Sequence, residues 1–189
     1  MSTTFTQPIR VFKRNNPSND GTIAPDNTGA VLVTQQQFIT NPIAATTGGN
    51  TVFTTADVGS TTPVPFVVPA GAIISNVRLY QTGTISAITG GAITVAIQIT
   101  DPTTGNVTTT TIGTITPSAT GGIAAIAFVN TSAVTAILAN VGPLDATLTF
   151  TAAAVSALTG TLAGTFDVNY TARNNDGSIT PYGSGYSNN

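Results

Sequence analysis

Residues 63–106 read PVPFVVPAGAIISNVRLYQTGTISAITGGAITVAIQITDPTTGN. Two runs in this stretch alternate apolar and polar side chains, one ending near Tyr80 and one at 92–100. The apolar positions of the second run are Ile93, Val95, Ile97 and Ile99. A period of two places successive side chains on opposite faces of a pleated strand, so this stretch predicts β structure.

Similar short runs occur elsewhere in this stretch and on both sides of it. They cover residues 51–55, 66–68, 72–82, 107–115, 122–129, 144–151 and 166–171. Strands at roughly ten-residue spacing, with turn residues between them, are typical of a sandwich or barrel. We therefore expect an all-β fold, an antiparallel β-sandwich of jelly-roll type, over residues 46–173.

Four segments of this body carry more specific expectations. DPTTGN at 101–106 predicts a hairpin turn. VTTTTIGTI at 107–115 has Thr on both faces, which indicates an edge or a contact with a neighbouring copy, and GIAAIAFV at 122–129 predicts a buried strand. One helix is expected after a cap at Asn130 or Thr131, because apolar residues follow at helical spacing until Gly142.

The ends of the chain differ from this body. Residues 1–45 contain short apolar runs separated by NNPSNDGTIAPDNTG, a series of turn residues, and predict an extended N-terminal arm. Residues 174–189 form a polar C-terminal tail. Arg10, Lys13 and Arg14 give the first fourteen residues a charge of +3, whereas residues 15–189 carry two Arg against seven Asp. A basic arm on an acidic body suggests docking to an acidic surface, with a short solvated strand as the alternative.

The composition removes most catalytic chemistry. The chain has no His, Cys or Glu, so a Ser-His-Asp triad, a thiolate nucleophile and the usual zinc ligands are unavailable. The candidate carboxylates are Asp57, Asp101, Asp145, Asp167 and Asp176, of which Asp101 and Asp176 lie in turns and Asp145 and Asp167 fall on polar strand faces. We expect no enzyme activity and no cofactor or metal site within one chain, although a calcium ion held between copies stays open.

The low charge content suggests that the protein is part of a larger assembly. Only 6% of the residues are charged, and Thr makes up about a fifth of the chain. Weakly charged surfaces associate readily because little repulsion keeps copies apart. The sequence also shows no apolar run long enough to cross a membrane, no signal peptide and no extended basic patch for nucleic acid.

Two motifs carry a family resemblance. VPAGAII at 68–74 opens a long alternating strand, and LAGTFDVNY at 162–170 closes the body. This pair resembles small virion proteins of tailed bacteriophages, whose β-sandwich or jelly-roll modules decorate the capsid exterior or form head fibres. The resemblance covers roughly residues 63–173. It implies homotrimers at three-fold positions of the shell, with extended arms that clamp neighbouring shell subunits, and it implies no catalytic residue.

We therefore expect a structural virion protein, a capsid decoration or cement protein on the capsid exterior, made in the host cytoplasm. Its partners would be the major capsid protein and further copies of itself, in a homotrimer, with no nucleic acid and no membrane. The expected shell-binding residues of the arm are Phe5, Ile9, Arg10, Phe12, Lys13 and Arg14. The alternative is a tail-fibre, tail-tip or surface glycan-binding module, for which the absence of Trp is unfavourable.

Overall fold

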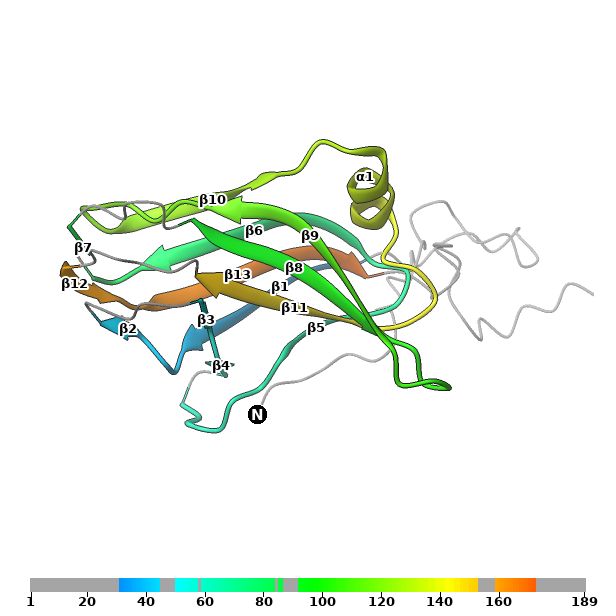
Figure 1. The fold of residues 1–189 in the computed structure, drawn as a ribbon, viewed down its shortest axis with the longest axis horizontal. Helices are drawn as coiled ribbons and strands as arrows, with labels where there is room; N and C mark the ends of the chain where they lie inside the picture. Colours follow the sequence, from blue (N-terminus) through cyan, green and yellow to red (C-terminus); the bar gives the residue numbers. More distant parts are fainter. Residues whose placement is uncertain are drawn as a thin grey trace, which may run out of the picture.

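The computed structural model describes residues 31–44, 50–57, 59–83, 85–86, 92–152 and 159–172. It confirms an all-β antiparallel fold with one short helix, and Figure 1 shows the strands as a curled sheet. The strands are β1 (Val31–Ile39), β2 (Ile43–Ala44), β3 (Thr51–Val52), β4 (Thr55–Ala56), β5 (Phe66–Val68), β6 (Ile73–Gln81), β7 (Ile85–Ser86), β8 (Ile93–Thr100), β9 (Val107–Ile115), β10 (Gly122–Phe128), β11 (Ala146–Ala152), β12 (Thr159–Leu162) and β13 (Gly164–Ala172). The helix is α1 (Ser132–Ala139), and among the described helices none could span a membrane.

One large sheet contains ten of these strands. Its order is β3-β11-β8-β9-β10-β6-β13-β1-β4, and β5 also pairs with β11. β8 to β10 are consecutive neighbours and β11 returns to lie beside β8, which is the spatial order of a Greek key. The finer expectation of a jelly roll stays a prediction. A small second sheet, β2-β12-β7, lies at one end of the molecule (Figure 1).

Aromatic rings join the two halves of the curled sheet. Phe150 of β11 and Phe166 of β13 are far apart in the strand order, yet their rings stack with centroids 3.9 Å apart and planes 12° apart. Phe53 meets Phe166 edge to face at 5.6 Å, and Phe66 meets Phe150 in the same way at 5.5 Å. All four side chains are buried. The core therefore lies inside the curl, between a β8–β11 side and a β13–β1 side.

A short segment closes the curl at one end. β3 pairs with the end of β11, and the next residue, Phe53, donates its N–H to the Phe150 carbonyl at 2.8 Å. β4 then pairs with the end of β1, next to a 2.8 Å hydrogen bond from the Thr40 N–H to the Thr54 carbonyl. Residues 51–56 therefore cross from β11 to β1. The Asn41 side chain holds this crossing segment in place through hydrogen bonds to the backbone of Val52 and Thr54.

Helix α1 fills a split in the sheet between β9 and β6. The two flanking strands each pair with only part of β10, and α1 contacts both of them. The side chain of Thr131 caps the helix by accepting a hydrogen bond from the Val134 N–H at 3.3 Å, as the sequence predicts. Val134 is buried beneath the helix, and the Val141 N–H donates to the Ala72 carbonyl at the start of β6.

The predicted hairpin turn is confirmed. The Asp101 N–H donates to the Asn106 carbonyl at 2.9 Å, and the Asp101 carboxylate accepts from the N–H groups of Thr103 and Thr104 at 2.8 and 3.3 Å. The Thr103 N–H, followed by the Thr104 side chain and N–H, lowers the pKa of the Asp101 carboxyl below its ordinary value. Asp101 therefore has a structural role in the turn that joins β8 to β9.

The expected arm of residues 1–45 is too long. Residues 31–39 form β1, which pairs with β13 over eight register positions from Val31–Ala172 to Phe38–Thr165. Residues 43–44 form β2 and pair with β12. The apolar run at 30–34 predicts the first half of this strand, but inward-facing polar side chains concealed the second half: Gln37 is buried and accepts a 2.7 Å hydrogen bond from the Thr55 hydroxyl. Only residues 1–30 remain as a candidate arm, and they and the tail lie outside the described residues.

Two further strand predictions need correction. β10 was expected to be buried, but exposed and partly buried residues alternate along it, and Ile123 is 64% exposed. β9 was expected at an edge, which holds for its first half alone: β8 pairs with it throughout, whereas β10 pairs only with residues 113–115.

Candidate interaction surface

The six arm residues predicted to bind a shell all lie outside the described residues. Their contacts therefore rest on the sequence alone. The described body offers three places where a partner could bind. They are the outward face of β10, β6, β13 and β1 (the outer face), the free edge of β1, and a shallow pocket at the end of the β8–β9 hairpin.

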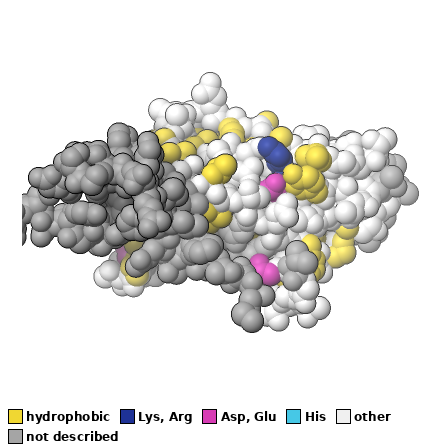
Figure 2. Space-filling model, turned by 180° about the vertical axis from the view of Figure 1, so that it is seen from behind, with side chains coloured by type: hydrophobic (Ala, Val, Ile, Leu, Met, Phe, Trp, Pro, Cys, Tyr) yellow, Lys and Arg dark blue, Asp and Glu magenta, His cyan; other side chains and the backbone are white. Residues whose placement is uncertain are grey.

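Cross-strand registers build the outer face in rows. One row runs Ile123, Tyr80, Thr165 and Phe38 across β10, β6, β13 and β1. It combines two aromatic rings with an aliphatic side chain that is 64% exposed. Figure 2 shows hydrophobic side chains gathered on this side of the molecule, beside a basic and an acidic side chain. An apolar patch next to charged groups is the usual composition of a protein-binding surface.

The next row contains the charged groups of this face. Arg78, Asp167 and Gln36 lie opposite one another on β6, β13 and β1. Within residues 31–172, Arg78 is the only Lys or Arg. The sequence placed Asp167 on a polar strand face, but the structure buries it, with 3% of its surface exposed. The Tyr80 side chain lies beside it and contacts its carboxylate.

Asp167 is only partly satisfied by the residues that cover it. Its Oδ2 accepts a hydrogen bond from the Tyr80 hydroxyl at 3.3 Å, whereas its buried Oδ1 has no hydrogen-bond partner among the described residues. A buried acceptor without a donor is costly, by about 1–3 kcal/mol. Oδ1 has almost no accessible surface, so a ligand or a partner protein could donate to it only after the side chains around it move.

The second feature is the outward edge of β1. β13 pairs with one side of this strand throughout, and β4 pairs with the other side only at Phe38 and Ile39. No described strand pairs with the outward edge of residues 31–37. This edge carries no Pro, no charged residue and no register shift, which are the usual devices against unwanted strand pairing. Leu32 on this edge is 70% exposed.

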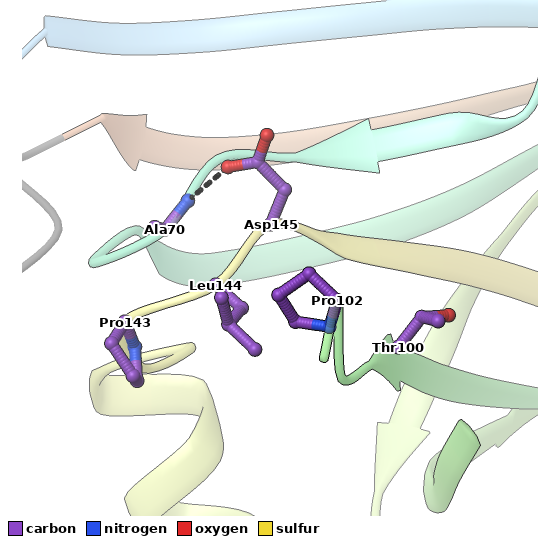
Figure 3. A pocket seen from close by; sticks show the side chains of 6 residues that line it. All are labelled: Ala70, Thr100, Pro102, Pro143, Leu144 and Asp145. Atoms are coloured by element: carbon purple, nitrogen blue, oxygen red, sulfur yellow. Dashed lines mark hydrogen bonds between the residues drawn. The ribbon is translucent and has the colours of Figure 1, made fainter. Parts of the chain in front are cut away.

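The third feature is a shallow pocket of about 430 Å³, lined by Ala70, Thr100, Pro102, Pro143, Leu144 and Asp145. Figure 3 shows the Asp145 carboxylate turned toward Ala70, whose N–H donates to Asp145 Oδ1 at 2.9 Å. This bond ties the start of β11 to the turn before β6. The other lining residues carry no charge, so the pocket offers a small neutral surface and no acid–base pair.

The structure does not bring the candidate carboxylates together. Asp101 and Asp145 hold turns, Asp167 lies in the middle of β13, and Asp57 is exposed and accepts a long 3.5 Å hydrogen bond from Gln37. In the described part of the chain, no group of three or more acidic, His or Cys side chains could hold a metal ion. Asp176 lies outside the described residues.

Sequence analysis missed both the free edge of β1 and the partly satisfied Asp167. In the run QQQFI at 35–39, inward and outward side chains alternate as a strand requires. The inward positions include Gln, so no alternation of apolar and polar residues marks the strand in the sequence. No sequence signal identifies the strand on either side of β1, so its edge could be found only from the structure.

The chain matches no family model, no curated protein and no solved structure.

Proposed function

We propose that this chain is a structural virion protein, a capsid decoration or cement protein that binds the outer face of a phage shell and bridges capsomers. One observation carries the proposal: the body is a closed β scaffold whose surface has few charges and several large exposed aliphatic side chains. Residues 31–172 contain one Arg and four Asp. The exposed aliphatic residues are Leu32, Val52, Val67, Val107, Ile123 and Val129. Such a surface suits permanent contact with other proteins.

The attachment of the arm supports a strapping mechanism. Residues 1–30, with Arg10, Lys13 and Arg14, lead directly into β1. A pull on the arm along the strand would load the whole β1–β13 ladder at once, because eight register positions share it. The basic and apolar arm residues would lie on an acidic shell surface. Association of several copies would raise the effective concentration of the remaining arms once one arm is bound.

The first test is quantitative gel densitometry of a native particle that contains the protein. A cement protein is expected in a simple ratio to the major capsid protein, at high copy number. A few copies per particle would instead indicate a fibre, tip or neck component. If no particle contains the chain, the virion proposal is wrong.

The second test removes the arm. A chain that starts at residue 31 keeps β1 intact, whereas deletion of residues 1–40 would remove this strand and destroy the fold. The shorter deletion should abolish binding to empty shells and leave the thermal unfolding of the body unchanged. A matched variant, Arg10→Gln with Lys13→Gln and Arg14→Gln, should weaken binding and reduce its salt dependence. Unchanged binding after deletion would contradict the strap.

The outer face favours one alternative, a glycan-binding module of a tail fibre, tail tip or surface protein. Tyr80 and Phe38 flank Thr165 in one row, and the neighbouring row supplies the polar residues Arg78, Asp167 and Gln36. An aromatic surface beside polar groups is what a sugar ring requires. A glycan array probed with the intact chain and with Asp167→Asn tests this. Binding that the substitution removes would favour the alternative over cement.

A further inference from the structure

We propose that β1 pairs antiparallel with β1 of a second copy, about a two-fold axis at Thr34, so that two curled sheets join into one continuous sheet. The edge concerned is that of residues 31–37. Among the described strands, nothing pairs with it, and it lacks the features that normally block strand addition. The proposal does not depend on the virion function.

The hydrogen-bonding direction of each β1 residue follows from one backbone hydrogen bond. The Thr40 N–H donates to Thr54, on the β4 side of the strand. In an antiparallel strand the N–H and C=O of one residue point to the same side, and the side alternates along the chain. Since the register is continuous from Val31 to Phe38, Leu32, Thr34 and Gln36 direct their N–H and C=O groups to the free edge.

These three residues are placed symmetrically for self-pairing. An antiparallel pairing centred on Thr34 sets Thr34 against Thr34 of the second copy and Leu32 against its Gln36. Every free N–H and C=O of residues 31–37 then finds a partner. A centre at residue 33 or 35 would leave part of the edge unpaired. Thr34 is therefore the midpoint both of the free edge and of the residues whose backbone groups point outward.

Side chains and neighbouring elements favour a second copy of this chain as the occupant. Residues 31–37 carry no charge, so two copies meet without like-charge repulsion. The two Thr34 side chains would lie opposite each other with their methyl groups in contact, while each hydroxyl donates to Asn169 Oδ1 of its own chain at 2.9 Å, and each exposed Leu32 would pack beside a Gln36. β4 begins opposite Phe38, so it would stop the second strand after Gln37, where that strand has reached its own Val31.

A two-fold contact through β1 is distinct from the three-fold association that the family resemblance implies. If trimers form through another face, β1 pairs would connect one trimer to the next. The expected mass of the protein in solution is therefore an even number of chains, either two or, when trimers also form, six.

Cysteine cross-linking tests the register, since the native chain has no Cys. Directly opposite residues of a hydrogen-bonded pair have Cα atoms about 5.5 Å apart, within the range that a disulfide spans. Thr34→Cys should therefore give a covalent dimer on mild oxidation. Leu32→Cys is the matched control: the two copies of residue 32 would lie about 14 Å apart along the strands and should stay unlinked. Leu32→Cys mixed with Gln36→Cys should cross-link.

A second variant tests the association itself by light scattering. Thr34→Pro removes an N–H that points to the free edge and a hydroxyl that donates to Asn169 Oδ1 at 2.9 Å, and it keeps the backbone hydrogen bonds of the β1–β13 ladder. It should halve the mass of the wild-type assembly and leave the circular dichroism spectrum unchanged. The proposal is overturned if the wild-type mass is one chain or an odd number of chains, or if Thr34→Cys cross-links no better than Leu32→Cys. Either outcome would assign the edge to another segment or another protein.

Discussion

Phe166 should contribute more to stability than any ring with a single aromatic neighbour. It stacks on Phe150 and meets Phe53 edge to face, whereas Phe66 meets only Phe150 among the rings that the structure describes. An aromatic pair contributes about 0.5–1.5 kcal/mol beyond the burial of its area. Phe166→Leu should therefore lower the free energy of unfolding by about 1–3 kcal/mol through its two pairs, in addition to the cost of the smaller side chain.

The comparison with Phe66→Leu isolates one aromatic pair. Phe66 and Phe166 are both fully buried, so the loss of volume is similar in the two variants and largely cancels. Phe166→Leu should then be less stable than Phe66→Leu by about 0.5–1.5 kcal/mol. For a chain of this length, each kcal/mol corresponds to about 2–4 °C in Tm.

Urea unfolding followed by circular dichroism, at one protein concentration, measures both differences. The slope of unfolding free energy against urea should stay constant, because neither substitution changes the area exposed on unfolding. A double-mutant cycle on Phe150 and Phe166 should give a coupling near the value of one pair. If Phe166→Leu costs no more than Phe66→Leu, the stacked rings do not hold the two halves of the sheet together.

Three further predictions follow from the described residues. The folded pKa of Asp101 should lie below the ordinary value of about 3.9 in an NMR titration, so its stabilising effect is present above that pH and is lost as the pH falls through the folded pKa. Gly164→Ala should destabilise the fold by about 1–3 kcal/mol in urea, because an added Cβ would collide with the Tyr80 carbonyl oxygen. Gln81→Ala should cost about 1–3 kcal/mol and speed amide exchange at Ser118, because Gln81 bonds both backbone groups of that residue.

Each of these predictions has a matched control. Asp101→Asn keeps an acceptor in the turn but does not titrate, so the hairpin should lose its response to acid. Gly105→Ala has open space around the new Cβ and should cost only its left-handed backbone, about 1–2 kcal/mol. Gln98→Ala, on the outward side of β8, should change stability by less than about 0.5 kcal/mol. Equal effects for Gln81 and Gln98 would contradict the role of the buried amide.

The sequence predicted the strands whose two faces differ in chemistry. β11 alternates Thr with Leu148, Phe150 and other apolar residues, and the structure buries those apolar positions. The same holds for β8 and for the helix that Thr131 caps. In these elements, local periodicity and burial agree, so a single chain segment contains enough information to identify the element.

Prediction failed where burial depends on distant partners. Gln37 looks like a surface residue, but it is buried because Thr55 donates to it from across the closing segment. Asp167 lies opposite Arg78 and accepts a hydrogen bond from Tyr80, and both residues are nearly ninety positions earlier in the chain. β10 is apolar on both faces, yet the face that carries Ile123, Ala125 and Ala127 is exposed. Strand order and register decide these cases, and no local pattern reports them.

Odd- and even-numbered residues of β1 have different roles, one in the fold and the other in the proposed assembly. Odd-numbered residues such as Val33 and Gln37 direct their backbone groups to β13 and their side chains inward, so they belong to the fold. Even-numbered residues, Leu32 and Thr34 among them, direct backbone groups to the free edge and side chains to solvent. The even positions can therefore vary to suit a partner without loss of the β1–β13 ladder. β1 would then hold the arm at its N-terminal end and a second copy along its free edge. Both attachments would depend on the same eight register positions between β1 and β13.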